Sequence, residues 1–485
     1  MFCEKILNAP SAATFNDFIL TPGHVHVEPD EIDVSTWLTR EIKLVSPFVS
    51  SPMDTVTESE MAIALARLGG LGFLHRNCSV EEEVEQARIV KRAESFIIRD
   101  VVSIKPDQMV GEAIKIMQEK KISGLPVVSG RRLQGIITKR DVYFSSPDKS
   151  VEDVMTKEVI TAGEDVTIEE AKELMRENKI EKLPIVDDNK RLRGLITIKD
   201  IYLREKYPHA TRDERGSLRV GAAISPFDLR RATALEKYVD ILVIDVAHFH
   251  NENVIEATKK IMDNVGVEII VGNIGTREAA LDIATRLDGV AAVRAGVGSG
   301  SICSTSEITK AGSPTLHATS LAADAFNEVG ADIKIIADGG IRTPGHAALA
   351  FAVGASTVMM GNIFARCKES PSELVIIGER YYKRYRGMGS AAAQAKRMAL
   401  DRYGQPSKGI AEGVEGLVPY AGEAAEVVDR FVAGLKASMG YAGASSIKDM
   451  WLVARLARLS QLGQQEMRPH SIVLPSTGVE AGEFR

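Results

Sequence analysis

A single cysteine follows three closely spaced glycines in the second half of the chain. Within the stretch Val293 to Thr305, Gly296, Gly298 and Gly300 stand two residues apart and lead to Cys303. Glycine lets the backbone turn tightly and approach a ligand, so its N–H and C=O groups can themselves bind. A thiol on such a loop is placed to act as a nucleophile; a buried structural cysteine after a turn is the alternative.

Two glycine-containing turns further along could hold a phosphate. Asp338-Gly339-Gly340 and Gly361-Asn362 each follow an apolar run, with few cations near them in the sequence. Backbone N–H groups at such turns commonly bind phosphate, Ser301 and Tyr385 could add hydroxyl donors, and Asp338 suits ribose hydroxyls. The pattern predicts a nucleoside monophosphate ligand; plain turns are the alternative.

A long connection follows these turns. Between Met388 and Pro419 it holds two polar motifs, Asp401–Gln405 and Glu412–Gly416. Long ordered insertions near the mouth of a barrel are often lids. We therefore expect a flap over about 388–419, with a solvated charged loop as the alternative.

Eight apolar runs, each followed by a helical pattern, must position these groups. Nearly continuous apolar runs are typical of parallel strands buried on both faces. They predict an α/β fold, a (β/α)8 TIM barrel, with the active site at the carboxyl ends of the strands, where the polar clusters lie. The predicted strands are 45–49, 71–74, 220–224, 241–244, 268–271, 289–293, 333–337 and 356–360.

An internal repeat interrupts the barrel pattern. Residues 96–144 and 154–203 share a Leu-Pro strand and a Thr-x-x-Asp ending, with Thr138 and Asp141 echoed 59 positions later by Thr197 and Asp200. The repeat resembles a tandem pair of CBS domains, whose Thr-x-x-Asp ends commonly bind adenine nucleotides, so an adenine or guanine nucleotide is expected there. Helix N-caps are the structural alternative. We expect the barrel in 1–92 and 207–485, with the inserted module in 93–206.

Composition limits the possible partners and compartments. The 485 residues carry a net charge of −6, which gives no general attraction to nucleic acid or anionic membranes. No apolar run is long enough to span a bilayer, and no signal peptide is recognisable. Four scattered cysteines without CxxC spacing suit a reducing compartment, so the cytoplasm is expected.

Six motifs in this order resemble the inosine-5′-monophosphate (IMP) dehydrogenase and GMP reductase family, and the dehydrogenase in particular. The resemblance covers nearly the whole chain, including the inserted repeat. The motifs are Ser51–Glu58, Gly296–Cys303, Ile336–Arg342, Tyr385–Ser390, Arg402-Tyr403 and Glu412–Gly416.

The resemblance implies a reaction in which IMP is oxidised to XMP with NAD⁺. Cys303 would add to C2 of the hypoxanthine, hydride would pass to NAD⁺, and water would release XMP from the covalent adduct. Arg402, beside Tyr403, is implied to activate this water, with Thr305 as a hydrogen-bond partner. An arginine base is chemically unusual because its pKa in water lies above about 12.

The resemblance also implies the ligand sites and the assembly, a homotetramer. The NAD side would contain Asp245, Asn273 and Gly296. Carbonyls of Gly298, Gly300 and Cys303 would form part of a K⁺ site, completed by Glu466, Met467 and Arg468 of the partner subunit. IMP would be held by Ser51, Met53, Ser301, Asp338, Gly339, Gly340, Gly361, Asn362, Tyr385, Met388, Gly389 and Glu412.

The chain departs from the family pattern around the cofactor, the phosphate and the lid. Phe249 is expected to place a large ring where the dinucleotide passes, and Asn362 replaces a phosphate-binding serine. The other departures are Asn16 for an aspartate, Gly404 for a phenylalanine, and Arg366-Cys367-Lys368 for a small neutral stretch.

Three other functions compete with the dehydrogenase. GMP reductase shares the barrel, the thiol and the nucleotide site, but typically lacks the Arg-Tyr motif and usually the CBS insertion, both of which are present. A catalytically silent nucleotide sensor is suggested by Phe249 and Asn362. A flavin-dependent barrel oxidoreductase would leave the thiol loop without a role.

Overall fold

The computed structural model describes residues 2–94, 96–99, 101–395 and 411–469. They divide into two compact units. The first contains the N-terminal segment up to Lys91, His209–Asp213 and the chain from Leu218 onward, and the second contains Arg92–Pro208 and Glu214–Ser217. None of the helices in these residues is long and apolar enough to cross a membrane.

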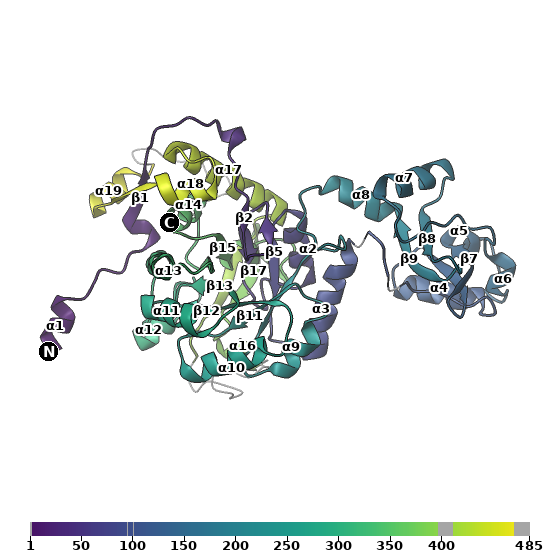
Figure 1. Ribbon diagram of the computed structural model, residues 1–485, viewed down its shortest axis with the longest axis horizontal. Coiled ribbons are helices and arrows are strands. Elements are labelled where there is room, and N and C mark those ends of the chain that lie inside the picture. The colour runs from purple at the N-terminus through teal and green to yellow at the C-terminus, as the bar shows by residue number, and fades with distance from the viewer. Residues whose placement is uncertain (1, 95, 100, 396–410, 470–485) are drawn as a thin grey trace. The chain divides into compact units, whose positions relative to one another are not determined.

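The first unit contains a closed barrel of eight parallel strands, so the predicted α/β barrel is confirmed. Neighbouring strands pair in the order β10-β11-β12-β13-β14-β15-β4-β5, with helices arranged outside them (Figure 1). Strand ends differ from the predicted ranges by up to three residues. The strands are β4 (Phe48–Ser50), β5 (Leu71–Leu74), β10 (Gly221–Ile224), β11 (Ile241–Asp245), β12 (Glu268–Ile274), β13 (Val290–Ala295), β14 (Lys334–Asp338) and β15 (Thr357–Met360).

A helix follows each strand, and local signals mark where these helices begin and end. The Asn251 side chain accepts hydrogen bonds from the backbone at the start of α10, and Gly69, at φ 79°, turns the chain after α2. The helices are α2 (Ser59–Arg67), α3 (Val80–Ala93), α9 (Leu229–Leu235), α10 (Glu252–Met262), α11 (Arg277–Arg286), α12 (Thr305–Thr309), α13 (Thr315–Val329), α14 (Pro344–Ala352) and α15 (Asn362–Ala365).

Apolar side chains fill the interior of the barrel and close its amino end. Val243, Ile270 and Ile336 from three strands share one cluster with Leu38 and Leu44, which come from the short hairpin β2 (Thr36–Trp37) and β3 (Lys43–Leu44). The strands are therefore sealed at one end, and the carboxyl end is the one available to ligands.

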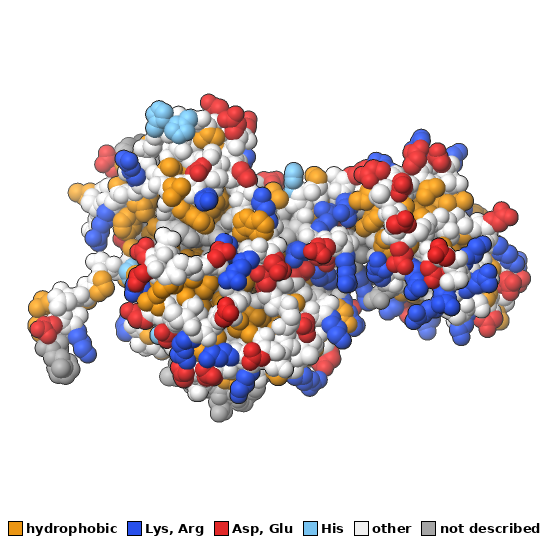
Figure 2. Space-filling model, viewed as in Figure 1, with side chains coloured by type: hydrophobic (Ala, Val, Ile, Leu, Met, Phe, Trp, Pro, Cys, Tyr) orange, Lys and Arg blue, Asp and Glu red, His pale blue; other side chains and the backbone are white. Residues whose placement is uncertain are grey.

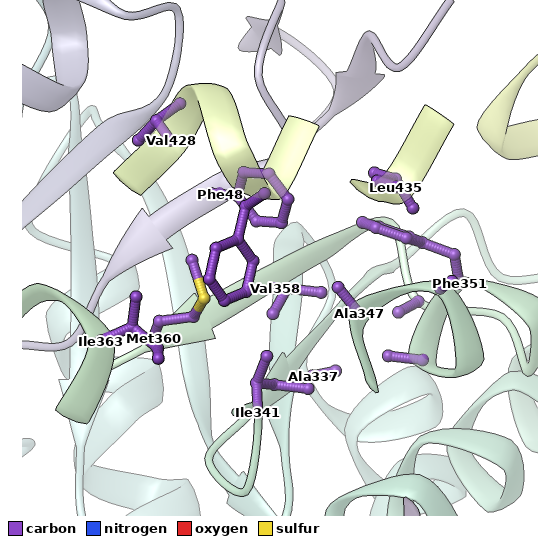
Figure 3. Packing of buried hydrophobic residues seen from close by; sticks show 14 of the residues in the cluster. Phe48, Ala337, Ile341, Ala347, Phe351, Val358, Met360, Ile363, Val428 and Leu435 are labelled. Carbon is purple, nitrogen blue, oxygen red and sulfur yellow. The ribbon is translucent and has the colours of Figure 1, made fainter. Parts of the chain in front are cut away.

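A second apolar layer lies outside the barrel. Figure 3 shows Phe48, Val358 and Met360 facing side chains of α14 and of the long helix α17 (Ala424–Ala442), and the Phe48 ring meets Phe431 edge to face with centroids 5.6 Å apart. Burial of these large side chains stabilises the unit by roughly 1.5–3 kcal/mol each. This layer anchors the strands β4 and β15, whose ends carry part of the site.

Further elements extend the first unit. A three-stranded sheet contains β16 (Leu374–Ile377), β17 (Arg380–Arg386) and β18 (Glu415–Pro419), and β1 (Phe18–Thr21) pairs with β19 (Arg455–Arg458). Acidic and basic side chains are interspersed over the face of this unit in Figure 2. The remaining elements are α1 (Phe2–Leu7), η1 (Phe15–Asp17), η2 (Pro29–Glu31), α16 (Ala391–Ala395), α18 (Ile447–Val453) and α19 (Gln461–Glu466).

The second unit consists of two similar halves. In each, two antiparallel strands carry a register shift at the equivalent place, after Val127 in the first hairpin and after Ile185 in the second, and each half has its own apolar cluster. The elements are α4 (Val110–Glu119), β6 (Gly124–Ser129), β7 (Arg132–Thr138), α5 (Lys139–Tyr143), α6 (Val151–Val154), α7 (Ile168–Glu177), β8 (Lys182–Val186), β9 (Leu192–Thr197) and α8 (Ile198–Lys206).

Candidate active site

A cavity of about 820 Å³ lies at the carboxyl ends of the barrel strands. Its wall combines the residues that follow most of the strands with the end of β17 and the segment before β18. The structure thus brings together residues that are more than 300 positions apart in the sequence. The sequence-predicted residues on this wall are Ser51, Met53, Asp245, Asn273, Gly296, Gly298, Gly300, Ser301, Cys303, Thr305, Asp338, Gly339, Gly340, Gly361, Asn362, Tyr385, Met388, Gly389 and Glu412.

The glycine loop carries Cys303 to the surface of this cavity and is held there by backbone hydrogen bonds. The Cys303 N–H donates to the Gly300 carbonyl at 3.0 Å, and the Val414 N–H donates to the Ile302 carbonyl at 3.0 Å. Cys303 also forms an antiparallel bridge with Gly413. The segment before β18 therefore braces the loop that presents the thiol.

Cys303 is the thiol best placed for chemistry. Cys78 and Cys367 are largely buried, and burial raises the pKa of both thiols to about 12, which keeps them protonated and unreactive. Cys3 is exposed on the N-terminal helix. Cys303 is exposed and lines the cavity.

A short chain of polar groups starts at this thiol. Cys303 Sγ donates to Thr305 Oγ1 at 3.3 Å, and Thr305 Oγ1 donates to Glu412 Oε2 at 3.1 Å. A thiol must lose its proton to become a nucleophile, and a hydroxyl can pass a proton to a carboxylate. The arrangement gives the thiol proton a path through Thr305 toward Glu412.

The Gly361 end of the cavity is narrow and offers hydroxyl groups. A Cβ atom at Gly361 would lie 2.8 Å from the Tyr385 hydroxyl oxygen and 3.2 Å from Met53 Sδ, so a side chain would not fit without displacement. Burial raises the pKa of Tyr385, which a hydrogen bond with Ser301 only partly offsets. The phenol therefore stays protonated and able to donate.

Two residues extend this end of the wall. Asn362 Nδ2 donates to Ser301 Oγ at 3.2 Å, and Arg366 Nε donates to Asn362 Oδ1 at 3.0 Å. Arg366 lines the cavity because it stands four positions, about one helical turn, after Asn362. The sequence prediction treated both residues as departures and did not recognise that they form one hydrogen-bonded unit.

A buried arginine joins two aspartates of the cavity wall. Arg294 donates from Nη2 to Asp338 Oδ2 and from Nη1 to Asp245 Oδ1, both at 2.7 Å, and Asn273 Nδ2 donates to Asp338 at 2.8 Å. Burial alone would lower the pKa of Arg294, but Asp338 and Asp245 outweigh it and raise the pKa above its ordinary value. Arg76 adds a further contact, with Nε 3.7 Å from Asp245 Oδ2.

Arg294 and Arg76 were missed by the sequence reasoning. A signal for Arg294 was present, because it is the only charged residue in the otherwise apolar strand Val290–Ala295. Buried charges are rarely kept without a charged partner. A cation in a barrel strand therefore indicates carboxylates at the end of that strand or of its neighbours.

An ion pair ties the first strand loop to the segment that carries Met388 and Gly389. Arg386, at the end of β17, donates from Nε to Asp54 at 3.0 Å, and Asn77 donates both to Asp54 and to the Ala393 carbonyl of α16. Burial would raise the pKa of Asp54, but its hydrogen bonds to Arg386 and Asn77 lower it below the ordinary value. Asp54 therefore stays charged and anchors the start of the predicted flap.

Several other predicted residues lie outside this cavity. Glu466, Met467 and Arg468 are exposed at the end of α19 and do not line it. Asn16 lines a smaller neighbouring cavity of about 410 Å³. Arg402, Tyr403 and Gly404 fall outside the described residues, as does the middle of the predicted flap, residues 396–410.

The expectation that Phe249 obstructs the dinucleotide path is wrong. The side chain has no exposed surface and is absent from the cavity wall, although Val246 and Ala247 belong to it. The Phe249 N–H donates to the Asn273 carbonyl at 2.9 Å, which fixes the loop after β11 with the ring in the core. A large apolar ring gains more from burial than from lining a polar cleft.

The paired Thr-x-x-Asp groups of the second unit cap helices. Asp141 accepts hydrogen bonds from the Thr138 N–H and hydroxyl, both at 2.7 Å, at the start of α5. Asp200 accepts from the same two groups of Thr197 at the start of α8. Both pairs therefore cap helices, as the structural alternative predicts. Nucleotide binding at these residues stays a prediction.

Comparison with protein families gives one match that spans most of the chain. Residues 12–470 match the model of the IMP dehydrogenase / GMP reductase domain. An inosine-5′-monophosphate dehydrogenase of Korarchaeum cryptofilum is 57% identical, over 95% of this chain and 97% of the relative. Another, from Methanocaldococcus jannaschii, is 48% identical over 98% of each chain.

A solved structure adds a different member of the same group. GMP reductase C318A from Trypanosoma brucei, in complex with guanosine 5′-monophosphate, superposes with a TM-score of 0.89 at 34% identity, over 97% of this chain and 100% of that chain. Such coverage includes the second unit. The inserted module therefore does not by itself separate a dehydrogenase from a reductase.

Proposed function

The chain belongs to the IMP dehydrogenase / GMP reductase family, and on that premise we propose that it oxidises IMP to XMP with NAD⁺ through a covalent adduct on Cys303. The observation that carries the proposal is the exposed Cys303 thiol on the wall of a cavity that also contains the Gly339-Gly340 and Gly361 turns and the Asp338 and Asp245 carboxylates. The dehydrogenases at 48–57% identity favour oxidation over reductive deamination.

IMP fits the cavity with its phosphate at the Gly361 end and its base at Cys303. Gly340 and Gly361 offer backbone N–H groups and Ser301 and Tyr385 offer hydroxyls, which together suit a phosphate; Gly339, whose N–H donates to the Met359 carbonyl, shapes the turn beside them. Asp338 is held by Arg294 with its carboxylate facing the cavity, which suits the ribose hydroxyls. The remaining IMP contacts are proposed for Ser51, Met53, Asn362, Met388, Gly389 and Glu412.

Covalent attack explains why a cysteine occupies the glycine loop. The Cys303 thiolate adds to C2 of the purine, the electron pair of the C2=N3 bond moves to N3, and the thiol proton passes through Thr305 toward Glu412. When hydride leaves C2, the pair on N3 restores the C2=N3 bond. After hydride leaves C2, the base remains joined to sulfur as a thioimidate. Sulfur is both a good nucleophile and a leaving group, so one residue serves oxidation and hydrolysis.

The NAD side of the cavity is proposed to contain Asp245, Asn273 and Gly296. Asp245 is suited to accept hydrogen bonds from ribose hydroxyls, and Arg294 and Arg76 hold its carboxylate in place. The buried position of Phe249 leaves this side of the wall to the small residues Val246 and Ala247, which fits a dinucleotide. NAD⁺, when bound, supplies the acceptor for the hydride from C2.

Hydrolysis needs an activated water at C2, and we assign this step to the flap. Water adds to C2, the C2–sulfur bond breaks, and XMP leaves with the thiolate restored. Arg402, with Tyr403 and Thr305, is proposed to position and activate the water. The ion pair between Asp54 and Arg386 supports this assignment because it anchors the chain that leads into the flap.

Potassium and assembly are proposed together. Carbonyl groups of Gly298, Gly300 and Cys303 belong to one tight loop, and a set of neutral carbonyls suits a large monovalent cation. Glu466, Met467 and Arg468 of the partner subunit would complete the site in a homotetramer. The exposed position of these residues in a single chain is compatible with that role.

The second unit is proposed to be a tandem CBS module that binds an adenine or guanine nucleotide. Two similar halves that each begin a helix with Thr and Asp support the proposal, since a polar pair at equivalent places gives two related sites.

A cytoplasmic location is proposed as well. The four cysteines are free, in keeping with that location.

The test is a spectrophotometric assay of the full chain. With IMP, NAD⁺ and K⁺, the protein should produce NADH absorbance, Cys303→Ala should abolish it, and a melting-temperature shift with ATP or GTP would test the CBS module. The GMP reductase structure makes the reductase the second candidate. NADPH consumption with GMP, in the absence of turnover with IMP, would overturn the dehydrogenase.

A further inference from the structure

A hydrogen-bonded chain of three side chains lies along the Gly361 end of the cavity. Arg366 Nε donates to Asn362 Oδ1 at 3.0 Å, and Asn362 Nδ2 donates to Ser301 Oγ at 3.2 Å. A guanidinium can only donate, so it fixes which end of the Asn362 amide faces it. The amide N–H group must then turn toward Ser301, and all three side chains line the cavity.

The local backbone holds Arg366 in position. Its carbonyl accepts a hydrogen bond from the Ala421 N–H at 2.9 Å, and the next residue, Cys367, is buried in the core with its N–H bonded to the Phe364 carbonyl. The side chain itself is half-buried. A cation whose position is already fixed loses little conformational entropy when it binds an anion.

The carboxylates of the cavity already have partners. Asp338 and Asp245 are both paired with Arg294, and Glu412 is bonded to Thr305 near the thiol. Two charges act on the Tyr385 phenol, since Asp338 raises its pKa and Arg366 lowers it. The Gly361 end thus combines a cation, hydroxyls and an amide N–H, a set of groups suited to an anion.

We propose that Arg366 binds the 5′-phosphate of the nucleotide directly, with Asn362 positioning its guanidinium. This inference rests on the proposed function, because it assigns a specificity-determining residue to the same site. A guanidinium pairs best with a doubly charged phosphate, so Arg366 selects the phosphorylated nucleotide over its nucleoside and favours the dianion over the monoanion.

The test compares Arg366→Met with the matched control Lys368→Met. Both changes remove one positive charge, but Lys368 is exposed, pairs with Glu423 at 2.8 Å and does not line the cavity. Loss of a charge-assisted contact weakens binding roughly tenfold to a hundredfold. Calorimetry should show this loss for IMP in Arg366→Met, with inosine affinity unchanged and the control within about threefold of the parent protein.

The pH dependence separates a phosphate ligand from a structural residue. Because the second pKa of a phosphate ester is about 6, the affinity ratio between the parent protein and Arg366→Met should grow as pH rises through that value. Inorganic phosphate should compete with IMP less well in the variant. Equal weakening of IMP and inosine, or a ratio independent of pH, would overturn the inference.

A second variant covers the case in which Arg366→Met does not fold. Arg366→Lys keeps the charge and loses the fork geometry, so IMP binding should weaken by about threefold to tenfold with no change for inosine. Unchanged IMP affinity in Arg366→Lys would also overturn the inference. Failure of the parent protein to bind IMP would instead refute the proposed function, a result distinct from any effect of these variants.

Discussion

Removal of the Arg294 guanidinium should damage both stability and the binding of two ligands. Arg294 is 6% exposed and donates three hydrogen bonds to carboxylates, two to Asp338 at 2.7 and 3.2 Å and one to Asp245 at 2.7 Å. Arg294→Met keeps most of the side-chain volume and leaves the two carboxylates without the cation between them.

The expected magnitude follows from the burial of this network. Removing one partner of a buried ion pair costs about 3–5 kcal/mol, because the other charge remains desolvated. The side chains of Asp338 and Asp245 are 11% and 22% exposed, and both line the cavity, so water can reach them. We therefore expect a loss of unfolding free energy at the lower end, about 3 kcal/mol.

Urea unfolding followed by tryptophan fluorescence measures this loss. Trp37 and Trp451 are the two tryptophans of the chain, and both belong to the first unit, so the signal reports the barrel. Calorimetry on the same variant should show weaker binding of both IMP and NAD⁺, since Asp338 and Asp245 lose the group that orients them.

A double-mutant cycle with Asp338→Asn tests the cause. Neutralising Asp338 relieves part of the repulsion, so Arg294→Met should cost less in that background, with a coupling of at least about 1 kcal/mol. Additive costs, or a loss below about 1 kcal/mol for Arg294→Met alone, would refute the view that the network is a charged structural unit.

Three further changes test other parts of the site. Gly361→Ala places a Cβ 2.8 Å from the Tyr385 hydroxyl oxygen and should raise the KM for IMP roughly tenfold, whereas Gly416→Ala, which meets no atom within 4 Å, should not. The pKa of Asp54 is lowered in the folded protein, so its stabilising effect is full above about pH 4 and is lost as pH falls through the folded pKa; the stability difference between the parent protein and Asp54→Asn should therefore shrink in acid denaturation profiles. Phe249→Ala should cost about 3–5 kcal/mol of stability without lowering the KM for NAD⁺. A lower KM would show that the ring obstructs NAD⁺ binding after all.

Much of the site could be predicted from sequence because barrel strands obey a simple rule. Parallel strands put their carboxyl ends at one edge, so residues such as Cys303, Asp338 and Gly361 had to meet once eight apolar runs were recognised. No knowledge of side-chain direction was needed for that step. The same argument placed Asp245 and Asn273 on the cavity wall.

The direction of a side chain in a loop could not be predicted in the same way. Phe249 lies in the loop after β11, where Val246 and Ala247 line the cavity. Its ring nevertheless lies in the core, because the Phe249 N–H is bonded to the Asn273 carbonyl of the next strand. Arg366 belongs to a stretch that departs from the family pattern, and no partner for it could be predicted from the sequence. The structure shows that Arg366 bonds to Asn362, which in turn bonds to Ser301.

The sequence by itself determined the barrel, the repeat and the thiol on its glycine loop, because these follow from periodicity and from the local freedom of glycine. Only the tertiary structure decided which charges pair. Arg294 lies between carboxylates from β11 and β14, and Arg366 is connected through Asn362 to a serine 65 positions earlier in the chain. Such pairs depend on distances between strands that are far apart in sequence, and the energy of a buried charge depends on what those strands bring within about 3 Å.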